Sequence, residues 1–83
     1  MSNVQVYGTD WCEDTQHARQ HLESLGVDYD YINVDRDKEA SDWVKILSHG
    51  KERKPTIEIG EEVLIEPNDQ DLDQALRANG VIH

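Results

Sequence analysis

Seven short segments with strand-like or helical patterning follow one another in this chain of 83 residues, and only a few residues separate them. Four segments alternate apolar and polar residues or are rich in aromatic and β-branched residues, as strands are. They lie at about 4–7, 29–34, 56–59 and 63–65. Three segments repeat apolar residues at helical spacing. They lie at about 12–25, between the turn at 35–37 and Gly50, and between Asn68 and Gly80.

The resulting order, β-α-β-α-β-β-α, predicts the fold class. Strands separated by a helix pair in parallel, whereas the tight turn at Gly60–Glu61 predicts an antiparallel hairpin from the last two strands. We therefore expect an α/β fold with one mixed four-stranded sheet flanked by three helices, in a single domain over residues 1–83. Gly8 is expected to break the first strand, and Asn68 to cap the last helix.

Cys12 is the only cysteine, so no intramolecular disulfide can stabilise a chain of this size. Small secreted domains usually carry an even set of cysteines, which favours a reducing compartment here. Residues 1–6 have neither the basic region nor the apolar run of a signal peptide, and no segment is long enough to span a membrane. We therefore expect a cytoplasmic protein with no membrane partner.

The formal net charge of −10 predicts repulsion from nucleic acid and from anionic membrane surfaces. The acidic residues are spread along the chain, which favours a solvated shell that maintains solubility over a surface dedicated to a basic partner. The segment at 51–54 is a local exception, because it holds three of the eight basic residues in four positions.

Three stretches carry a resemblance to a known family: VYGTDWCEDT at 6–15, KPTIEI at 54–59 and EPNDQDL at 66–72. With a cysteine just after the first strand and a proline just before the third, the chain resembles the glutaredoxin branch of the thioredoxin superfamily. The T-x-W-C and E-P segments are more similar to mycoredoxin-type bacterial glutaredoxins than to human-type ones. The resemblance covers essentially the whole chain and implies a thioredoxin-like fold of the glutaredoxin type.

The resemblance assigns the attacking thiol to Cys12. A thiol at a helix N-terminus faces free backbone N–H groups and the positive end of the helix dipole, and both favour the thiolate that attacks a disulfide. The family's cis-proline falls on Pro55, where it holds the backbone of Lys54 opposite the cysteine so that it pairs with an extended thiol ligand. Trp11 and Trp43 are expected to pack, and Trp11 is also a candidate flat apolar contact for a protein substrate.

Thr15 occupies the position of the family's second cysteine, which excludes a dithiol cycle. The resemblance then implies a monothiol route, in which Cys12 attacks a mixed disulfide, carries the small thiol and is released by a second molecule of that thiol. Thr15 is either a hydrogen-bond partner of the thiolate or an ordinary residue of the first helical turn. Both interpretations stay open at this point.

Charge near the thiol departs from the family pattern. Many glutaredoxins carry a lysine three residues before the cysteine, and Thr9 stands there in this chain. Asp10, Glu13 and Asp14 surround Cys12 instead, and their negative charge opposes formation of the thiolate. Carboxylates in the first turn of a helix are also ordinary partners of its dipole.

Two segments are implied to form the small-thiol site. Glu66–Pro67 replaces the family's Gly-Gly pair, which receives the γ-glutamyl end of glutathione, although the helix start at Asn68 and Asp69 can still offer backbone donors to a carboxylate. Lys51 and Arg53 fall where family members place cationic contacts to the glycine carboxylate. This basic cluster is therefore either half of a thiol-binding site or a solvated group of charges.

We therefore predict a monothiol glutaredoxin-like thiol-disulfide oxidoreductase that acts as a monomer on mixed disulfides between proteins and a low-molecular-weight thiol. Glutathione or another small thiol is the expected co-substrate, and no tightly bound cofactor or metal is expected. The alternative is a redox-silent thioredoxin-fold module that binds a protein partner in the groove between Trp11 and Pro55.

Two metal-dependent interpretations are less well supported. An iron–sulfur carrier would use a Cys-Gly-Phe-Ser motif, but Glu13 and Asp14 replace its middle residues. His17 and His21 share a helix stripe with Glu13 and lack a fourth ligand, so we interpret them as polar helix surface.

Overall fold

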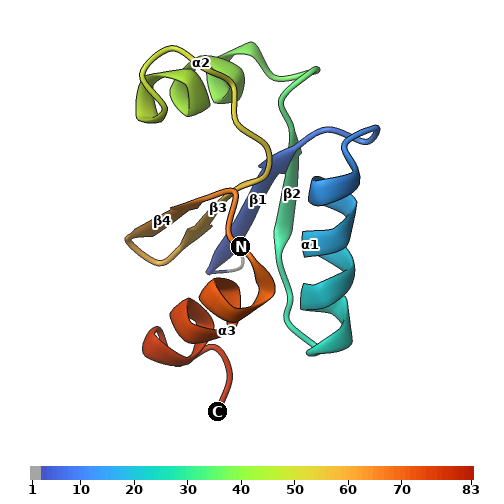
Figure 1. Ribbon diagram of the computed structural model, residues 1–83, viewed down its shortest axis with the longest axis vertical. Coiled ribbons are helices and arrows are strands. Elements are labelled where there is room, and N and C mark those ends of the chain that lie inside the picture. The colour runs from blue at the N-terminus through green and yellow to red at the C-terminus, as the bar shows by residue number, and fades with distance from the viewer. Residues whose placement is uncertain (1–2) are drawn as a thin grey trace.

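The chain folds into the predicted order of strands and helices (Figure 1). The computed structural model describes residues 3–83; residues 1 and 2, which belong to the predicted domain range and to the N-terminal segment considered above, lie outside the described part. In chain order the elements are β1 (Val4–Gly8), α1 (Glu13–Ser24), β2 (Asp30–Asn33), α2 (Lys38–Leu47), β3 (Thr56–Ile59), β4 (Glu62–Ile65) and α3 (Asp69–Ala78).

One mixed sheet joins the four strands in the order β2-β1-β3-β4. β1 pairs in parallel with β2, which the crossover through α1 permits, whereas β1 with β3 and β3 with β4 pair antiparallel. Gly60 adopts a φ of 60° in the turn between β3 and β4, a backbone conformation that glycine adopts without strain. The predicted mixed sheet and its terminal hairpin are confirmed.

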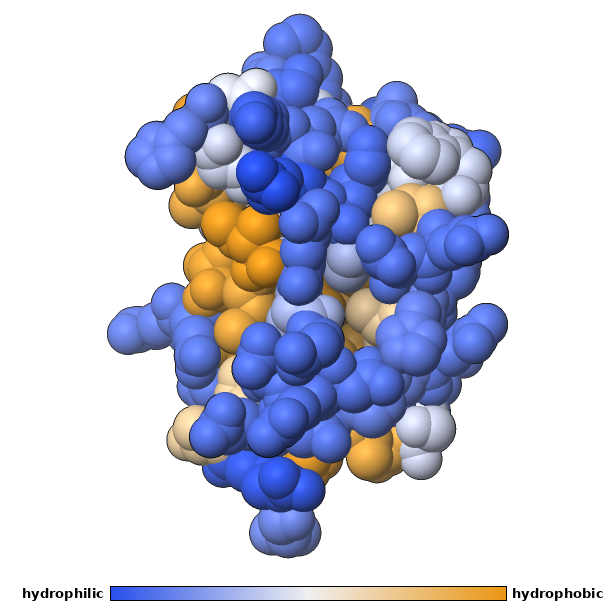
Figure 2. All heavy atoms as spheres, viewed as in Figure 1, coloured by the Kyte–Doolittle hydropathy of each residue, from blue (hydrophilic) through white to orange (hydrophobic). Residues whose placement is uncertain are grey.

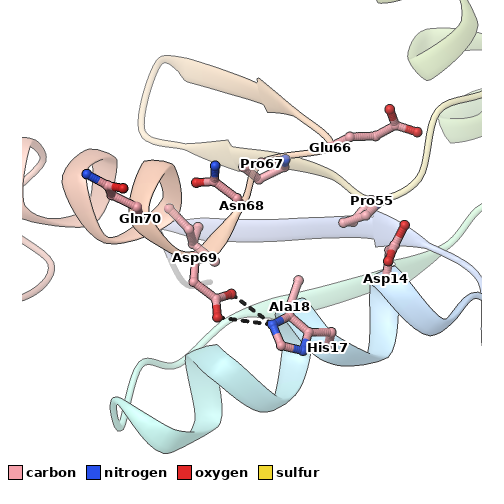
Figure 3. Close-up of a pocket in the computed structure, with 10 residues that line it drawn as sticks. Asp14, His17, Ala18, Pro55, Glu66, Pro67, Asn68, Asp69 and Gln70 are labelled. Atoms are coloured by element: carbon pink, nitrogen blue, oxygen red, sulfur yellow. Dashed lines mark hydrogen bonds and ion pairs between the residues drawn. The ribbon is translucent and has the colours of Figure 1, made fainter.

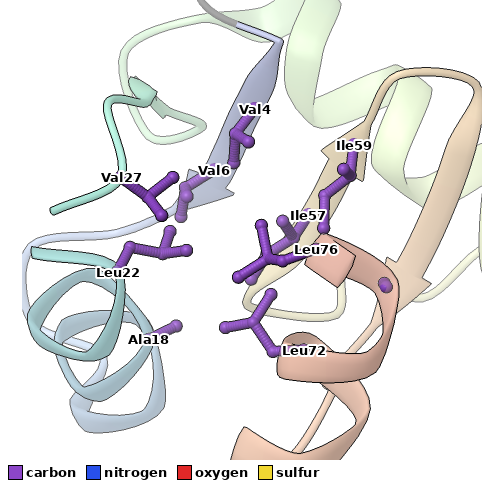
Figure 4. Close-up of a cluster of buried hydrophobic side chains, with 10 residues drawn as sticks. Val4, Val6, Ala18, Leu22, Val27, Ile57, Ile59, Leu72 and Leu76 are labelled. Carbon is purple, nitrogen blue, oxygen red and sulfur yellow. The ribbon is translucent and has the colours of Figure 1, made fainter. Parts of the chain in front are cut away.

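The main core lies where α1 and α3 cover one face of the sheet (Figure 4). Val6 of β1 and Ile57 of β3 are register partners, and both are completely buried. Leu22 of α1 and Leu72 and Leu76 of α3 pack against them. Each such side chain contributes about 1.5–3 kcal/mol by leaving water. The apolar spacing that predicted these helices is therefore the face that holds them to the sheet.

A smaller core lies on the opposite face of the sheet, under α2. Ala40 and Val44 of α2 are buried together with Val34. Tyr7 and Trp43 pack against this cluster with their ring centroids 4.8 Å apart. Trp43 is thus a packing residue, as predicted. The sheet is consequently covered on both faces, with two helices on one side and one on the other.

Most of the visible surface is hydrophilic, and hydrophobic residues gather on the side where α2 and β4 lie (Figure 2). Ile46 of α2 and Ile65 of β4 are exposed large apolar residues of these two elements. None of the helices in residues 3–83 is long and apolar enough to cross a membrane.

Element ends differ slightly from the prediction. Gly8 does not break the first strand: it is the last residue of β1 and pairs with Asn33 of β2. Cys12 lies just before α1 as its N-cap rather than inside it. The predicted cap at Asn68 is confirmed, because its side chain accepts a hydrogen bond from the Asp71 N–H at 2.8 Å.

Candidate active site around Cys12

The loop from β1 to α1 presents Cys12 at the N-terminus of the helix. Its backbone N–H donates to the Thr9 carbonyl at 3.3 Å, and its carbonyl accepts from the Gln16 N–H at 3.1 Å, the first bond of the helix. The Cys12 side chain makes no capping bond and is partly exposed. The free thiol therefore lies beside the unpaired N–H groups of the first turn, where a thiolate is favoured.

The start of β3 lies opposite the thiol. Cys12 Sγ is 3.9 Å from the carbonyl oxygen of Lys54, and the peptide bond between Lys54 and Pro55 is cis. The resemblance implied this cis bond and this juxtaposition of Lys54 with the cysteine, and the geometry agrees with both. Residues far apart in the sequence are thereby brought together at one end of the sheet.

Trp11 is held on the surface rather than in a core. Trp11 is 68% exposed, so the expectation that it packs as Trp43 does is wrong. The indole Nε1–H donates to an Asp35 carboxylate oxygen at 2.8 Å, and the Lys54 ammonium lies 4.6 Å from the ring centroid. A hydrogen bond and a cation–π contact thus fix the orientation of the indole on the residue that precedes Cys12.

The Lys54 side chain is itself anchored. Its ammonium is 3.1 Å from a carboxylate oxygen of Glu52, and Glu52 accepts a hydrogen bond from the Ser41 hydroxyl of α2. The hydrogen bond from Ser41, followed by Lys54, lowers the pKa of Glu52. Glu52 therefore stays ionised and keeps Lys54 in place over Trp11.

A groove of about 580 Å³ opens between α1, the start of β3 and the N-terminus of α3 (Figure 3). Two predicted site residues besides Pro55, namely Asn68 and Asp69, line it. Asp14 and His17 face them from α1, so the structure brings these segments together as predicted. Glu66 and Pro67, which the resemblance implied for the small-thiol site, also line the groove. The remaining lining residues were not singled out as site residues from the sequence: Ala18, Gln70 and Leu72.

The predicted cationic contacts do not line this groove. Arg53 donates to a Glu66 carboxylate oxygen at 3.2 Å, so its charge is already paired with an acidic residue of the groove. Lys51 is exposed, and its side chain forms no ion pair with another residue of the described range 3–83. Asp14, Glu66 and Asp69 instead give the groove three carboxylates.

Histidines of α1 bind aspartates of α3. His17 Nε2 lies 3.0 Å from an Asp69 oxygen, and His21 Nε2 lies 2.7 Å from an Asp73 oxygen (Figure 3 shows the first contact). These contacts join the two helices at the wall of the groove. Across residues 3–83, no group of three or more histidine, cysteine or acidic side chains is arranged to hold a metal ion.

Thr15 is completely buried beneath the loop. A Cβ added at Gly8 would lie 2.4 Å from its Oγ1 and Cγ2 atoms, so the two residues are in tight contact. The Thr15 hydroxyl has no hydrogen-bond partner among the described residues, and the Thr9 hydroxyl is in the same state. Thr15 thus fills space between β1 and α1, and a hydrogen bond to the thiolate stays a prediction.

Comparisons with known proteins agree with this geometry. The family model described as Glutaredoxin matches residues 4–64. Mycoredoxin 1 of Corynebacterium glutamicum is 47% identical over 58 residues, which is 69% of this chain and 70% of that protein. The protein belongs to the glutaredoxin family. It is a mycoredoxin-like, glutaredoxin-type thiol oxidoreductase, and its single cysteine fits a monothiol member.

Solved structures of other glutaredoxin-type proteins show the same thioredoxin-like fold. A glutaredoxin from Archaeoglobus fulgidus superposes with a TM-score of 0.75 at 22% identity, over 93% of this chain and 88% of that one. The glutaredoxin-like NrdH-redoxin from Escherichia coli superposes with a TM-score of 0.74 at 21% identity, over 86% and 91%.

The sequence alone does not single out two anchoring residues of this glutaredoxin. Asp35 lies in the predicted turn at 35–37, and Glu52 is the acidic residue within the basic segment at 51–54. Their partners Trp11 and Lys54 lie 24 and two residues away, and only the folded arrangement shows that they hold one surface. The acidic residue within the basic run at 51–54 was the available signal.

Replacing Thr15 tests its role. We expect Thr15→Val to raise the free energy of unfolding by about 1 kcal/mol, because it removes a buried hydroxyl without a partner and keeps the side-chain shape. Thr56→Val is the matched control: that hydroxyl is equally buried but donates to the Arg53 carbonyl at 2.9 Å, so its loss should destabilise. Urea denaturation measures both. Equal destabilisation by the two changes would contradict the account of Thr15.

Proposed function

We propose that Cys12 is the nucleophile and thiol carrier of this glutaredoxin. Glutaredoxins act with low-molecular-weight thiols and protein disulfides. The observation that carries the proposal is the free thiol at the N-terminus of α1, 3.9 Å from the Lys54 carbonyl. That position combines favoured ionisation with a backbone edge on which an extended thiol ligand can lie.

The reaction proceeds by two exchanges. The Cys12 thiolate attacks the small-thiol sulfur of a protein mixed disulfide; a new disulfide forms between Cys12 and the small thiol, and the protein sulfur leaves and takes up a proton. A second small thiol, as its thiolate, then attacks the bound small-thiol sulfur. Cys12 leaves as a thiolate and the two small thiols form a disulfide. Overall, the protein sulfur of the mixed disulfide is reduced to a thiol, and the one free small thiol is oxidised as it joins the other in their disulfide.

In this proposal, the residues around Cys12 bind the protein part and the small-thiol part of the mixed disulfide. Lys54 and Pro55 present the backbone edge, and Trp11 bounds the thiol on its exposed side. The first residues of α3, Asn68 and Asp69, offer backbone N–H groups to the carrier of the small thiol. Thr15 supports the loop from below.

The charges of the groove bear on which small thiol is used. Glutathione carries two carboxylates, and the groove is itself lined by the carboxylates of Asp14, Glu66 and Asp69. Arg53 already forms an ion pair with Glu66 and is therefore not free to bind a glutathione carboxylate. Like charges brought together in a partly enclosed site weaken binding. We propose that the preferred thiol has an uncharged carrier, whose binding needs no cationic contact from Lys51 or Arg53.

The remaining properties follow from the same chemistry. A single thiol that must stay reduced suits the cytoplasm. The net charge of −10 disfavours self-association, so we propose that residues 1–83 act as one monomeric domain. No tightly bound cofactor takes part in the two exchanges.

The first test is turnover of a glutathione mixed disulfide with reduced glutathione and a coupled reductase. We expect Cys12→Ser to lower the rate to the uncatalysed background, because a hydroxyl neither ionises at neutral pH nor forms the mixed disulfide. Ser24→Ala, a change of similar size at the other end of α1, should leave the rate unchanged.

Full turnover in the Cys12→Ser variant would contradict the proposal. A protein partner that stays bound to Cys12→Ser under strong reductant, in the absence of any turnover by the unmodified chain, would instead support the redox-silent binding module.

The second test compares small thiols on one peptide. We expect a mixed disulfide with mycothiol, whose sugar carrier bears no carboxylate, to show a kcat/KM at least about tenfold above the same peptide with glutathione. Glu66→Gln should narrow this difference, because it removes one groove carboxylate and frees Arg53. Equal or higher kcat/KM with glutathione would show that the groove charges do not select the thiol.

A further inference from the structure

An exposed aromatic side chain lies next to the thiol and contributes to neither core. Trp11 is 68% exposed, yet three side chains determine its orientation. Asp35 binds the indole N–H, Lys54 lies over the ring, and Glu52 holds Lys54. A large aromatic side chain fixed in this way makes a binding surface that loses little conformational entropy when a partner docks.

The surface beside Trp11 carries uncompensated negative charge. Asp10, Glu13, Asp14 and Asp35 are all exposed around the loop and the first turn of α1. Within residues 3–83, none of the four forms an ion pair with a lysine or arginine, although Arg36 follows Asp35 in the chain.

Neutral donors occupy two of these carboxylates and leave their charge in place. The Tyr31 hydroxyl donates to Asp10 at 2.8 Å, and burial together with this carboxylate raises the pKa of Tyr31 to about 12. Trp11 donates to Asp35. Among the cations of this region, Lys54 is bound by Glu52 and Arg53 by Glu66, whereas Arg19 lies over the Tyr31 ring, 3.9 Å from its centroid. The acidic side chains around the indole still outnumber the basic ones.

We infer that the face formed by Trp11, Asp10, Glu13 and Asp35 docks protein clients whose modified cysteine is flanked by lysine or arginine. The inference rests on the proposed function of Cys12 and adds the class of client. The protein part of the mixed disulfide lies over this face, while the small thiol lies toward the groove.

Both components of the face favour the same occupant. A lysine or arginine side chain of the client stacks against the exposed part of the indole, as the Lys54 ammonium does on its own side. The carboxylates attract the same cation and speed its encounter with the thiol, an effect that salt screens over about 8–10 Å at moderate ionic strength. A second copy of this chain, with its own charge of −10, is repelled from the face.

The test uses three peptides that differ only beside their central cysteine, with lysine, glutamine or glutamate as flanking residues. Each is prepared as a mixed disulfide with mycothiol and, in a second series, with glutathione. We expect kcat/KM for the lysine peptide to exceed that for the glutamate peptide by at least about tenfold at low salt, and the ratio to shrink at high salt. Trp11→Ala should lower the ratio of the lysine peptide to the glutamate peptide at low salt, because it raises KM for the lysine peptide.

Two charge-reversal variants distinguish an effect of the local face from an effect of the overall net charge. Glu13→Lys and Glu61→Lys change the net charge equally, but Glu61 lies in the turn after β3, at the end of the sheet away from Cys12. We expect Glu13→Lys to reduce the ratio of lysine to glutamate peptide several-fold and Glu61→Lys to change it little. The test compares the ratio of the two peptides because Glu13→Lys also alters the intrinsic reactivity of the Cys12 thiol. That effect is common to both peptides and cancels in their ratio.

The outcomes distinguish this inference from the proposed function. Equal kcat/KM for the three peptides, or equal effects of the two charge reversals, would overturn the docking face while leaving Cys12 as the nucleophile. An absence of Cys12-dependent turnover of the glutamine peptide in both series would overturn the proposed function itself.

Discussion

The antiparallel pairing of β1 with β3 determines where the thiol lies. Tyr7, near the end of β1, is the register partner of Thr56 at the start of β3. The residues that follow β1 therefore meet the residues that precede β3, and Cys12 comes to face the Lys54 carbonyl. The pairing is fixed by side chains buried under α1 and α3, so the geometry of the thiol depends on the main core.

The distribution of charge around Cys12 underlies the two selectivities proposed for this glutaredoxin. Arg53 and Lys54, two of the predicted site residues, are each bound by a carboxylate, and the groove and the loop carry further acids that pair with no lysine or arginine in the described part of the chain. The helix dipole of α1 acts at the thiol against this background. The same acids that weaken binding of an anionic thiol attract a basic client, so one charge pattern underlies both proposed selectivities.

The sequence predicted the order of elements, the mixed sheet and the cap at Asn68, because apolar period and turn residues are local signals. The positions of Cys12, Pro55 and Asn68 around one site followed from the family resemblance. Local patterns could not predict that Asp35 and Lys54 hold the Trp11 side chain on the surface, because these contacts depend on which loops the sheet brings together. Local patterns also left open whether Arg53 contacts the small thiol. In the structure Arg53 instead forms an ion pair with Glu66.

The central claim is that Cys12 takes the small thiol, rather than the protein, from a mixed disulfide. Intact-mass spectrometry of the chain after brief reaction with one equivalent of a peptide–mycothiol mixed disulfide, without free thiol, tests it directly. The account predicts a mass increase of one small thiol per chain, located at Cys12, with release of the reduced peptide. An adduct of the peptide, or an unmodified Cys12, would contradict it.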